Sequence, residues 1–142
     1  AIADKLESAQ IPMPLIFSHN DLLPANFLYS DDRIYLIDFE YAGYSTAMFD
    51  LAGLSSNAGF NRHQSLEMLE CYFGGPPEAD LVRSLEAMQC ASLLREAMWS
   101  MVSEIFLNAP GIDYVAYTSS QLDAFSHRLD SYQSRYGKIC PS

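Results

Sequence analysis

The chain has 142 residues, 49% of them hydrophobic and 13% aromatic, so it can bury a core as a single domain over residues 1–142, and disorder along its whole length is excluded. It carries 18 acidic residues against 8 basic ones, a formal charge of -10 with no cluster of Lys or Arg, which excludes nucleic-acid and anionic-membrane binding and favours cationic partners. No apolar run approaches the roughly 20 residues of a membrane span, so we expect a cytoplasmic protein.

The first third of the chain is predicted to contain a helix end and a small β element. Residues 1–9 favour a helix, which a pair of prolines then ends, and residues 15–17 form a short extended run. Two β-rich runs, 27–29 and 34–37, flank the polar turn signal at 30–33. This pattern predicts a β-hairpin.

The remainder of the chain is predicted to be helical. A short helix is expected over residues 48–57 and a longer one over 62–73, with Asn61 as its N-cap and Gly74 at its end. The run 78–109 lacks Pro and Gly, which predicts one long helix or two in tandem.

Prolines and apolar spacing add detail to the last two predicted helices. Pro76 and Pro77 are expected in the first turn of the long helix, and a final helix is expected after Gly111, ending at Gly137. The predicted apolar faces are Leu94, Met98, Met101 and Ile105 on the long helix, and Leu122, Phe125, Leu129, Tyr132 and Tyr136 on the final one. The fold class is therefore α+β, predominantly helical, with a small β-hairpin.

The residues with the clearest chemistry lie on either side of that hairpin. Asp21 and Asn26 stand five residues apart on an irregular loop, and Asp38 follows the hairpin, so the three can converge on one point. Phosphoryl transfer needs a carboxylate to receive the proton of the attacking hydroxyl, together with hard oxygen ligands for Mg²⁺. Asp21 suits the first role, and Asn26 and Asp38 suit the second.

Each of these residues also has an ordinary structural interpretation. Asn and Asp in a proline-containing loop are common turn formers, and a lone histidine such as His19 is more often a hydrogen-bonded structural residue than a catalyst. It is the combination, at these spacings, that favours the phosphoryl-transfer interpretation.

The pattern His19-x-Asp21-x4-Asn26, followed by Asp38-Phe39-Glu40, resembles the catalytic and metal-binding loops of kinase-like phosphotransferases. More narrowly, it resembles the aminoglycoside phosphotransferase and choline/ethanolamine kinase superfamily. Asn20 in place of the protein-kinase Arg, and Glu40 in place of the Gly of the DFG motif, favour the small-molecule branch. Residues 37–44, with residues 49–52 a few positions further on, are most similar to bacterial choline kinases of the lipopolysaccharide-decorating type.

This resemblance implies a fold, an activity and roles for individual residues. The fold would be the C-terminal lobe of the protein-kinase-like fold, whose β-hairpin carries the catalytic and metal loops. Asp21 would be the catalytic base, His19 would brace the catalytic loop, and Asn26 and Asp38 would bind Mg²⁺. Asp50 would support that loop structurally from the start of a helix, where the helix dipole also favours an acid.

The activity implied is an ATP-dependent small-molecule O-phosphotransferase, a kinase acting on choline or a related amino alcohol. Two alternatives stay open. The acceptor could be an aminoglycoside, or the chain could be a non-catalytic helical binding module that retains the kinase-like loop and exposes an apolar face.

A quaternary ammonium substrate is drawn to aromatic faces and to nearby negative charge. Tyr41 and Tyr44 follow Glu40 closely, and Trp99 lies three residues after Glu96, on the same helical face. In the choline kinases that the sequence resembles, a tryptophan pair at i, i+3 helps to enclose the ammonium. Here Trp99 stands at the second position and Glu96 at the first, so the five residues are candidate substrate contacts.

These substrate contacts also have an alternative. Trp99 would then be a core or groove residue, and Glu96 a solvated charge paired with Arg95 or Arg83.

The nucleotide lobe expected of a kinase-like enzyme has no counterpart in this sequence. There is no glycine-rich phosphate loop, and the lysines are Lys5 and Lys138 alone. We therefore expect the N-terminal lobe to be absent from this chain, which would be an expression fragment, a proteolysis product or the product of a split gene. The chain alone should be inactive. The apolar face on which the N-terminal lobe would dock could bind that missing lobe or drive self-association.

Overall fold

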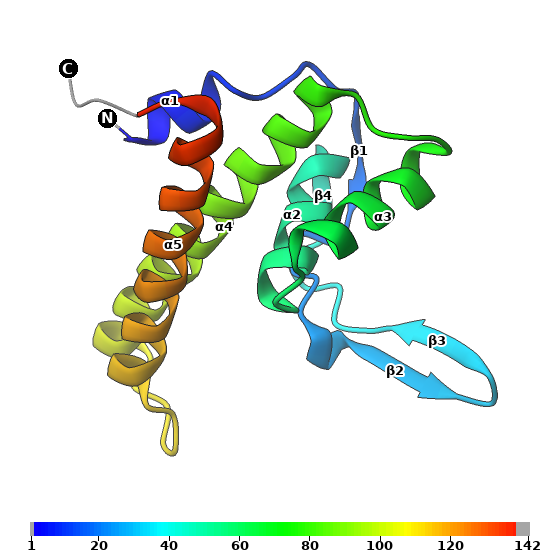
Figure 1. Cartoon of the computed structure of the whole chain (residues 1–142). Helices are drawn as coiled ribbons and strands as arrows, with labels where there is room; N and C mark the ends of the chain where they lie inside the picture. Colours follow the sequence, from blue (N-terminus) through cyan, green and yellow to red (C-terminus); the bar gives the residue numbers. More distant parts are fainter. Residues whose placement is uncertain (1, 139–142) are drawn as a thin grey trace.

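The computed structural model describes residues 2–138, which form four short strands and five α-helices (Figure 1). In chain order the elements are α1 (Ile2–Glu7), β1 (Leu15–Ser18), a 3₁₀ turn (Pro24–Asn26), β2 (Phe27–Ser30), β3 (Arg33–Leu36), β4 (Gly43–Thr46), α2 (Ala47–Asn57), α3 (Arg62–Phe73), α4 (Ala79–Phe106) and α5 (Tyr114–Tyr136). The predicted α+β, mainly helical class is confirmed. Residue 1, part of the first predicted helix, lies outside the described range.

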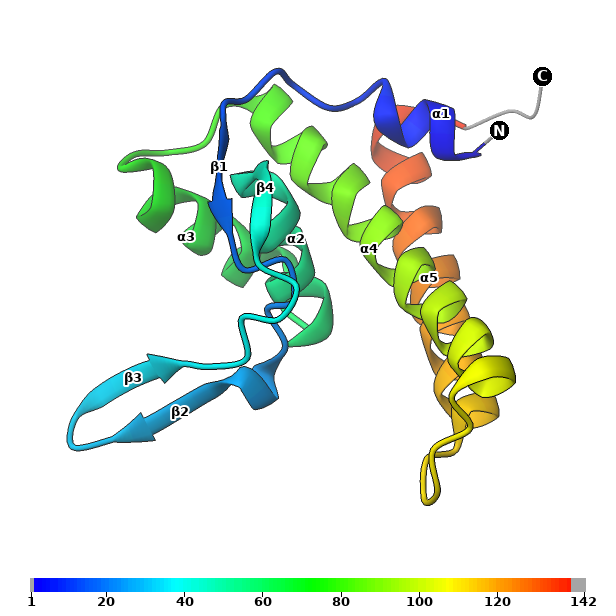
Figure 2. The same ribbon diagram turned by 180° about the vertical axis from the view of Figure 1, so that it is seen from behind.

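The strands form two separate antiparallel pairs. The predicted hairpin is β2–β3, in which Phe27 lies opposite Leu36, and its turn residues Asp31 and Asp32 have φ of 50° and 57°. Two consecutive positive φ values suit the right-handed twist of a two-residue hairpin, and Asp tolerates them. Figure 2 shows this hairpin extending away from the helices.

The second pair, β1–β4, was not predicted, because Gly43–Thr46 contains one large apolar residue and no alternating pattern. Ser18 at the end of β1 lies opposite Gly43 at the start of β4. The chain between them leaves and returns at the same end of this small sheet. The pairing therefore brings residues 19–26 close to residues 37–42, on either side of the hairpin.

The predicted limits of α3 are confirmed. Asn61 forms a capping box with Gln64, and Gly74 ends the helix in the left-handed region, at φ 80°. The prediction for Pro76 and Pro77 was wrong, since α4 begins only at Ala79. Glu78 at its N-cap is extended, with ψ 155°, so both prolines lie in the connection before the helix.

Helix α4 is a single helix of 28 residues, but the apolar face predicted for residues 94–105 is not the face that it buries there. Met98, Met101 and Ile105 are exposed, whereas small side chains such as Ala97 and Ser100 are buried. Small residues let α5 approach α4 closely, and the Ser100 hydroxyl donates to the carbonyl of Tyr114 at 3.0 Å. Proximity to α5 therefore decided which face of α4 is buried.

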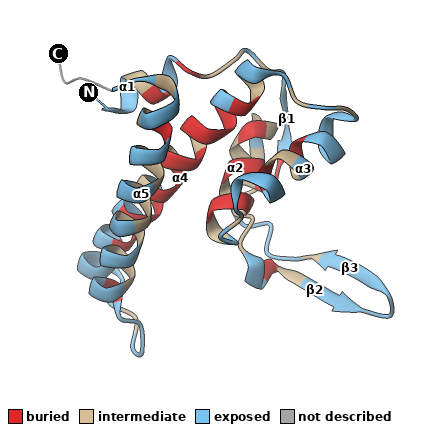
Figure 3. Cartoon of the chain, in the orientation of Figure 1, coloured by how far each residue is buried: buried red, intermediate tan, exposed pale blue. Residues whose placement is uncertain are grey.

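Two clusters of buried side chains share α4 as a wall, and Figure 3 shows their buried residues along α4 and α2. The first joins α2, α3 and the start of α4 through Met48, Leu51, Ala52, Leu69, Val82 and Leu85. The second joins α1 and the residues just after it to α4 and α5, through Leu6, Ala9, Ala87, Cys90 and Tyr132. Phe125, Leu129 and Tyr136 of α5 pack against this cluster, as predicted for the apolar face of the final helix. Within the described residues, no helix combines the length and apolar character needed to cross a membrane.

Candidate active site

The loop that begins with His19 is anchored by Asp50, in the first turn of α2. The backbone N–H of His19 donates to Asp50 Oδ2 at 2.8 Å, and that of Asn20 donates to Oδ1 at 2.7 Å. Asn20 has a φ of 66°, and its side chain bonds Tyr41 and Ser45. A carboxylate that accepts two backbone N–H groups holds this strained turn in one conformation.

His19 is buried and connects the loop to the segment that follows the hairpin. Its Nδ1 accepts the backbone N–H of Asp21 at 3.3 Å, and its Nε2 lies 2.8 Å from the carbonyl oxygen of Ile37. This pattern places the ring proton on Nε2. The imidazole ring also meets the ring of Phe39 edge-on, with the ring centroids 4.6 Å apart. Both ring nitrogens are thus used to position Asp21 and its surroundings.

Asn26 makes a second connection between the same two segments. Its Nδ2 donates to the backbone oxygen of Asp21 at 3.0 Å, and its own backbone oxygen accepts from Ile37 at 3.0 Å. Because Nδ2 is used in this way, Oδ1 is the atom left to bind a ligand. Asp38 comes directly after Ile37 and has a left-handed φ of 66°. The backbone hydrogen bond from Ile37 to Asn26 therefore holds the two expected metal ligands, Asn26 and Asp38, on neighbouring segments.

A pocket of about 260 Å³ opens beside the loop. Its lining comes from the loop, the segment after β3, α4 and α5, and consists of Asp21, Leu23, Glu40, Tyr41, Arg95, Glu96, Trp99 and Tyr117. Five residues predicted from the sequence for the base or the substrate contacts, Asp21, Glu40, Tyr41, Glu96 and Trp99, are brought together here. They lie on three separate segments of the chain.

Tyr44, also expected at the substrate site, lies elsewhere. It is on β4, opposite Phe17 of β1, and the two rings meet edge-on with centroids 6.3 Å apart. The pairing of β4 with β1 thus makes Tyr44 an exposed cross-strand contact of the small sheet, and Tyr44 is not among the residues that line the pocket.

Glu96 is buried rather than solvated, which corrects the alternative drawn from the sequence. Its Oε1 lies 2.7 Å from Nη2 of Arg95, as that alternative expected, whereas Arg83 donates instead to the hydroxyl of Tyr132. The same Nη2 lies 3.8 Å from Oδ1 of Asp21. Arg95 therefore lies between the two carboxylates.

Arg95 is itself held in place on two further sides. Its Nη1 donates to the carbonyl of Asn20 at 3.4 Å, and its guanidinium lies over the ring of Phe49, 5.1 Å from the centroid. The sequence pattern indicated Arg95 only as a partner of Glu96. Its proximity to Asp21 arises because α4 packs along α2, which holds the loop.

Tyr117 of α5 is a pocket residue that sequence analysis missed. Its hydroxyl donates to Oε2 of Glu96 at 3.3 Å, and burial together with this negative neighbour raises the pKa of Tyr117 to about 12. An available signal was the short connection between α4 and α5, which makes the helices antiparallel and sets the start of α5 beside the later turns of α4.

The charges around Asp21 act in opposite directions. Partial burial raises the pKa of its carboxyl, and the negative charge of Glu96 raises it further. Arg95 and His19 oppose this increase, but the pKa of Asp21 remains above that of an ordinary aspartate. Such a carboxyl binds a proton more readily than an exposed one.

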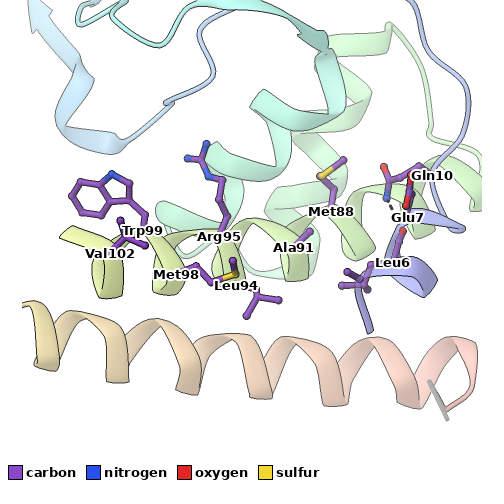
Figure 4. Close-up of a pocket in the computed structure, with 11 residues that line it drawn as sticks. Leu6, Glu7, Gln10, Met88, Ala91, Leu94, Arg95, Met98, Trp99 and Val102 are labelled. Carbon is purple, nitrogen blue, oxygen red and sulfur yellow. Dashed lines mark hydrogen bonds between the residues drawn. The ribbon is translucent and has the colours of Figure 1, made fainter. Parts of the chain in front are cut away.

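A larger apolar groove of about 640 Å³ adjoins the pocket (Figure 4). Its walls come from α1, the residues just after it, and α4, and its lining residues are Ala3, Leu6, Glu7, Gln10, Met88, Ala91, Leu94, Arg95, Met98, Trp99 and Val102. Arg95 and Trp99 line both spaces and project from α4 on the same side in Figure 4. Trp99 is therefore a groove residue as well as a pocket residue.

Comparisons with known proteins agree with this geometry. Residues 3–71 match the family model for choline/ethanolamine kinase. Protein LicA of Haemophilus influenzae is 41% identical over 54 residues, which cover 38% of this chain and 20% of LicA. Ethanolamine kinase 2 of Mus musculus is 28% identical over 129 residues, 77% of this chain and 33% of that kinase.

Solved structures extend the match to nearly the whole chain. A choline/ethanolamine kinase family protein from Mesorhizobium loti superposes with a TM-score of 0.80 at 27% identity, covering 90% of this chain and 44% of that one. Plasmodium vivax ethanolamine kinase shares the fold, with a TM-score of 0.76 at 20% identity over 94% of this chain and 38% of that one. The chain thus spans less than half the length of these proteins. It is choline/ethanolamine kinase-like in sequence and in fold, and its structure matches the C-terminal portion of that kinase fold.

Proposed function

We propose that the protein acts in the ATP-dependent phosphorylation of a small amino alcohol. Asp21 accepts the proton of the substrate hydroxyl while the hydroxyl oxygen attacks the γ-phosphorus of ATP. The bond from the γ-phosphorus to the oxygen that bridges it to the β-phosphate breaks, ADP leaves, and Asp21 later releases its proton to water. The products are a phosphate ester and ADP.

The observation that carries this proposal is the composition of the pocket around Asp21. Three carboxylates, those of Asp21, Glu40 and Glu96, line it together with the guanidinium of Arg95. The remaining walls include the rings of Tyr41, Trp99 and Tyr117. Excess negative charge beside aromatic rings suits an ammonium group, and a carboxylate with a raised pKa suits the abstraction of a hydroxyl proton.

The size of the pocket supports a small acceptor. Its volume of about 260 Å³ lies below the roughly 300 Å³ at which sites for drug-sized ligands begin. An amino alcohol of a few carbons fits such a space, whereas a multi-ring aminoglycoside would extend far outside it. This favours an amino alcohol over an aminoglycoside.

The residues present also fit a magnesium ion. Oδ1 of Asn26 and the carboxylate of Asp38 would hold it, and two protein oxygens suffice because Mg²⁺ keeps several waters and binds substrate phosphates. Within residues 2–138 no group of three or more His, Cys, Asp or Glu side chains forms another metal site. When bound, the ion would neutralise charge on the β- and γ-phosphates.

We further propose that groups contacting the α- and β-phosphates are supplied from outside these 142 residues. Neither a glycine-rich phosphate loop nor a strand lysine occurs in the sequence, and Lys5 lies in α1. Ethanolamine kinase 2 of Mus musculus and the Mesorhizobium loti protein are each more than twice as long as this chain.

A phosphorylation assay of the protein encoded by the whole gene tests the proposal. ATP, Mg²⁺ and a panel of ethanolamine, choline, thiamine and kanamycin would be used, with Asp21→Asn as the inactive variant and Asp123→Asn, an exposed carboxylate of α5, as the matched control. We expect an amino alcohol to be phosphorylated by the wild type and the control, and Asp21→Asn to lose at least about 100-fold in rate. A folded wild type that phosphorylates nothing would contradict the proposal.

One observation favours a second candidate, a non-catalytic binding module. The apolar groove, whose lining includes the exposed side chains of Met98 and Val102, offers a surface on which another protein could pack. Analytical ultracentrifugation of a catalytically silent protein would test it, and a strict monomer over a wide concentration range would count against it.

A further inference from the structure

Glu96 is the most deeply buried charged group in the pocket wall. Its side chain is 8% exposed, and each carboxylate oxygen is held by one donor, Oε1 by Arg95 at 2.7 Å and Oε2 by Tyr117 at 3.3 Å. A carboxylate oxygen accepts up to two hydrogen bonds, so each still has one lone pair. Glu96 is therefore rigidly held, lines the pocket and has acceptor capacity left for a ligand.

The two kinds of small organic ammonium make opposite demands on such a wall. A primary ammonium donates three N–H bonds and gains a charge-assisted hydrogen bond from a fixed carboxylate. A quaternary ammonium has no N–H group and is stabilised by enclosing aromatic faces. Here Tyr41 and Trp99 are 56% and 47% exposed, and the hydroxyl of Tyr117 is turned to Glu96, so aromatic enclosure is incomplete.

We infer that Glu96 is the specificity-determining residue of this pocket and that, through hydrogen bonds to N–H groups, it selects a primary over a quaternary ammonium. The inference rests on the proposed amino-alcohol kinase function and specifies its substrate class. Arg95 and Tyr117 are the positioning residues that fix the carboxylate.

The position of Arg95 adds a constraint on the length of the substrate. The same nitrogen, Nη2, lies 2.7 Å from Oε1 of Glu96 and 3.8 Å from Oδ1 of Asp21, so these two oxygens are at most 6.5 Å apart. An amine bound to Glu96 and a hydroxyl presented to Asp21 must then be joined by a short linker. Ethanolamine, with two carbons between nitrogen and oxygen, meets both requirements.

The test compares ethanolamine with its N-methyl and N,N-dimethyl derivatives and with choline, in the full-length protein with ATP and Mg²⁺. The series removes N–H donors one at a time while the hydroxyl stays the same. We expect kcat/KM to fall along the series, by roughly 10- to 100-fold between ethanolamine and choline, mainly through KM, because a hydrogen bond to a buried charge is lost. This comparison needs no variant.

Glu96→Gln supplies the second arm, with Glu104→Gln, an exposed glutamate on the same helix, as its control. The first should flatten the preference across the series, and the second should leave it as in the wild type. Choline used as well as ethanolamine by the wild type would overturn the inference while leaving the kinase function intact. No product with any member of the series would overturn the proposed function itself.

Discussion

Asp21 receives its chemical properties from residues far away in the sequence. Its carboxyl is partly buried beside Glu96, which raises its pKa, and Arg95 from α4 and His19 from the loop act against that increase. A base must be ionised to accept a proton, so activity should rise with pH as Asp21 deprotonates. The midpoint of that rise should lie above the pKa of an ordinary aspartate.

Replacing Arg95 with Met should move this midpoint to still higher pH. The substitution removes a positive charge that lowers the pKa of Asp21, so the protonated and inactive form persists further up the pH scale. The pH profile of kcat/KM measures the effect, and Arg33→Met on the exposed hairpin should leave the profile unchanged. A midpoint that stays in place or moves down would contradict this assignment of Arg95.

Asp50 shows how one side chain can stabilise a whole loop. Asp50→Ala would remove the acceptor of two backbone N–H groups and should lower the free energy of unfolding by roughly 1.5–3 kcal/mol, the range for hydrogen bonds to a charged group. Asp80→Ala removes an exposed aspartate from the first turn of α4 and should cost less than about 1 kcal/mol. Urea denaturation measures both, and equal losses would mean that the loop contacts contribute nothing.

At the level of elements, small side chains let α4 approach α5 closely. Ala97 is fully buried, so Ala97→Leu should overpack the core and lower the free energy of unfolding by about 1–3 kcal/mol. Met98→Leu, one residue later but exposed, should change it by no more than about 0.5 kcal/mol. Denaturant midpoints of the two variants provide the comparison. Similar values would place the buried face of α4 elsewhere.

Two glycines, one just after the end of a helix and one inside a helix, should respond to replacement by alanine in opposite directions. Gly74 ends α3 at φ 80°, so Gly74→Ala would be strained and should lower the free energy of unfolding by about 1–2 kcal/mol. Gly53 lies inside α2, with open space where the methyl group of an alanine would stand. Gly53→Ala should therefore raise the free energy of unfolding by about 0.5–1 kcal/mol. Thermal unfolding shows whether each variant is more or less stable than the wild type. A change in the same direction for both would contradict these backbone assignments.

At the scale of the whole molecule, Glu86 joins three helices. It is buried in α4, and its Oε1 lies 3.1 Å from Nε of Arg62 in α3 and 3.0 Å from Nη1 of Arg135 in α5. Each arginine is partly exposed and can serve as the partner of the carboxylate when the other is removed. The two contacts are therefore expected to be energetically coupled.

Arg62→Gln and Arg135→Gln should each cost less than about 1 kcal/mol, because one cation still faces the buried carboxylate. The double variant leaves that charge without either arginine and should cost roughly 3–5 kcal/mol, more than the two single losses together. A double-mutant cycle by urea denaturation measures the difference. Simple additivity would show that the two arginines act independently.

Much of the molecule was predictable because local signals specify local structure. The hairpin at 30–33, the cap at Asn61 and the end of α3 at Gly74 each depend on the backbone preferences of a few adjacent residues, and all three predictions were confirmed. The kinase-like resemblance likewise depended on short spacings around Asp21 and Asp38. Patterns of this kind carry their meaning within one segment of chain.

What the sequence could not determine was which segments meet. The pairing of β1 with β4 moved Tyr44 away from the pocket, and the close contact of α4 with α5 buried Ala97 and Ser100 in place of the apolar face. The packing of α4 along α2 brought Arg95 to Asp21, and the packing of α5 along α4 brought Tyr117 to Glu96. The sequence by itself therefore determined most of the elements and the loop residues proposed for the chemistry, whereas only the tertiary structure decided the walls of the pocket. The physical reason is that packing between distant segments depends on the whole set of side-chain shapes, which no local pattern contains.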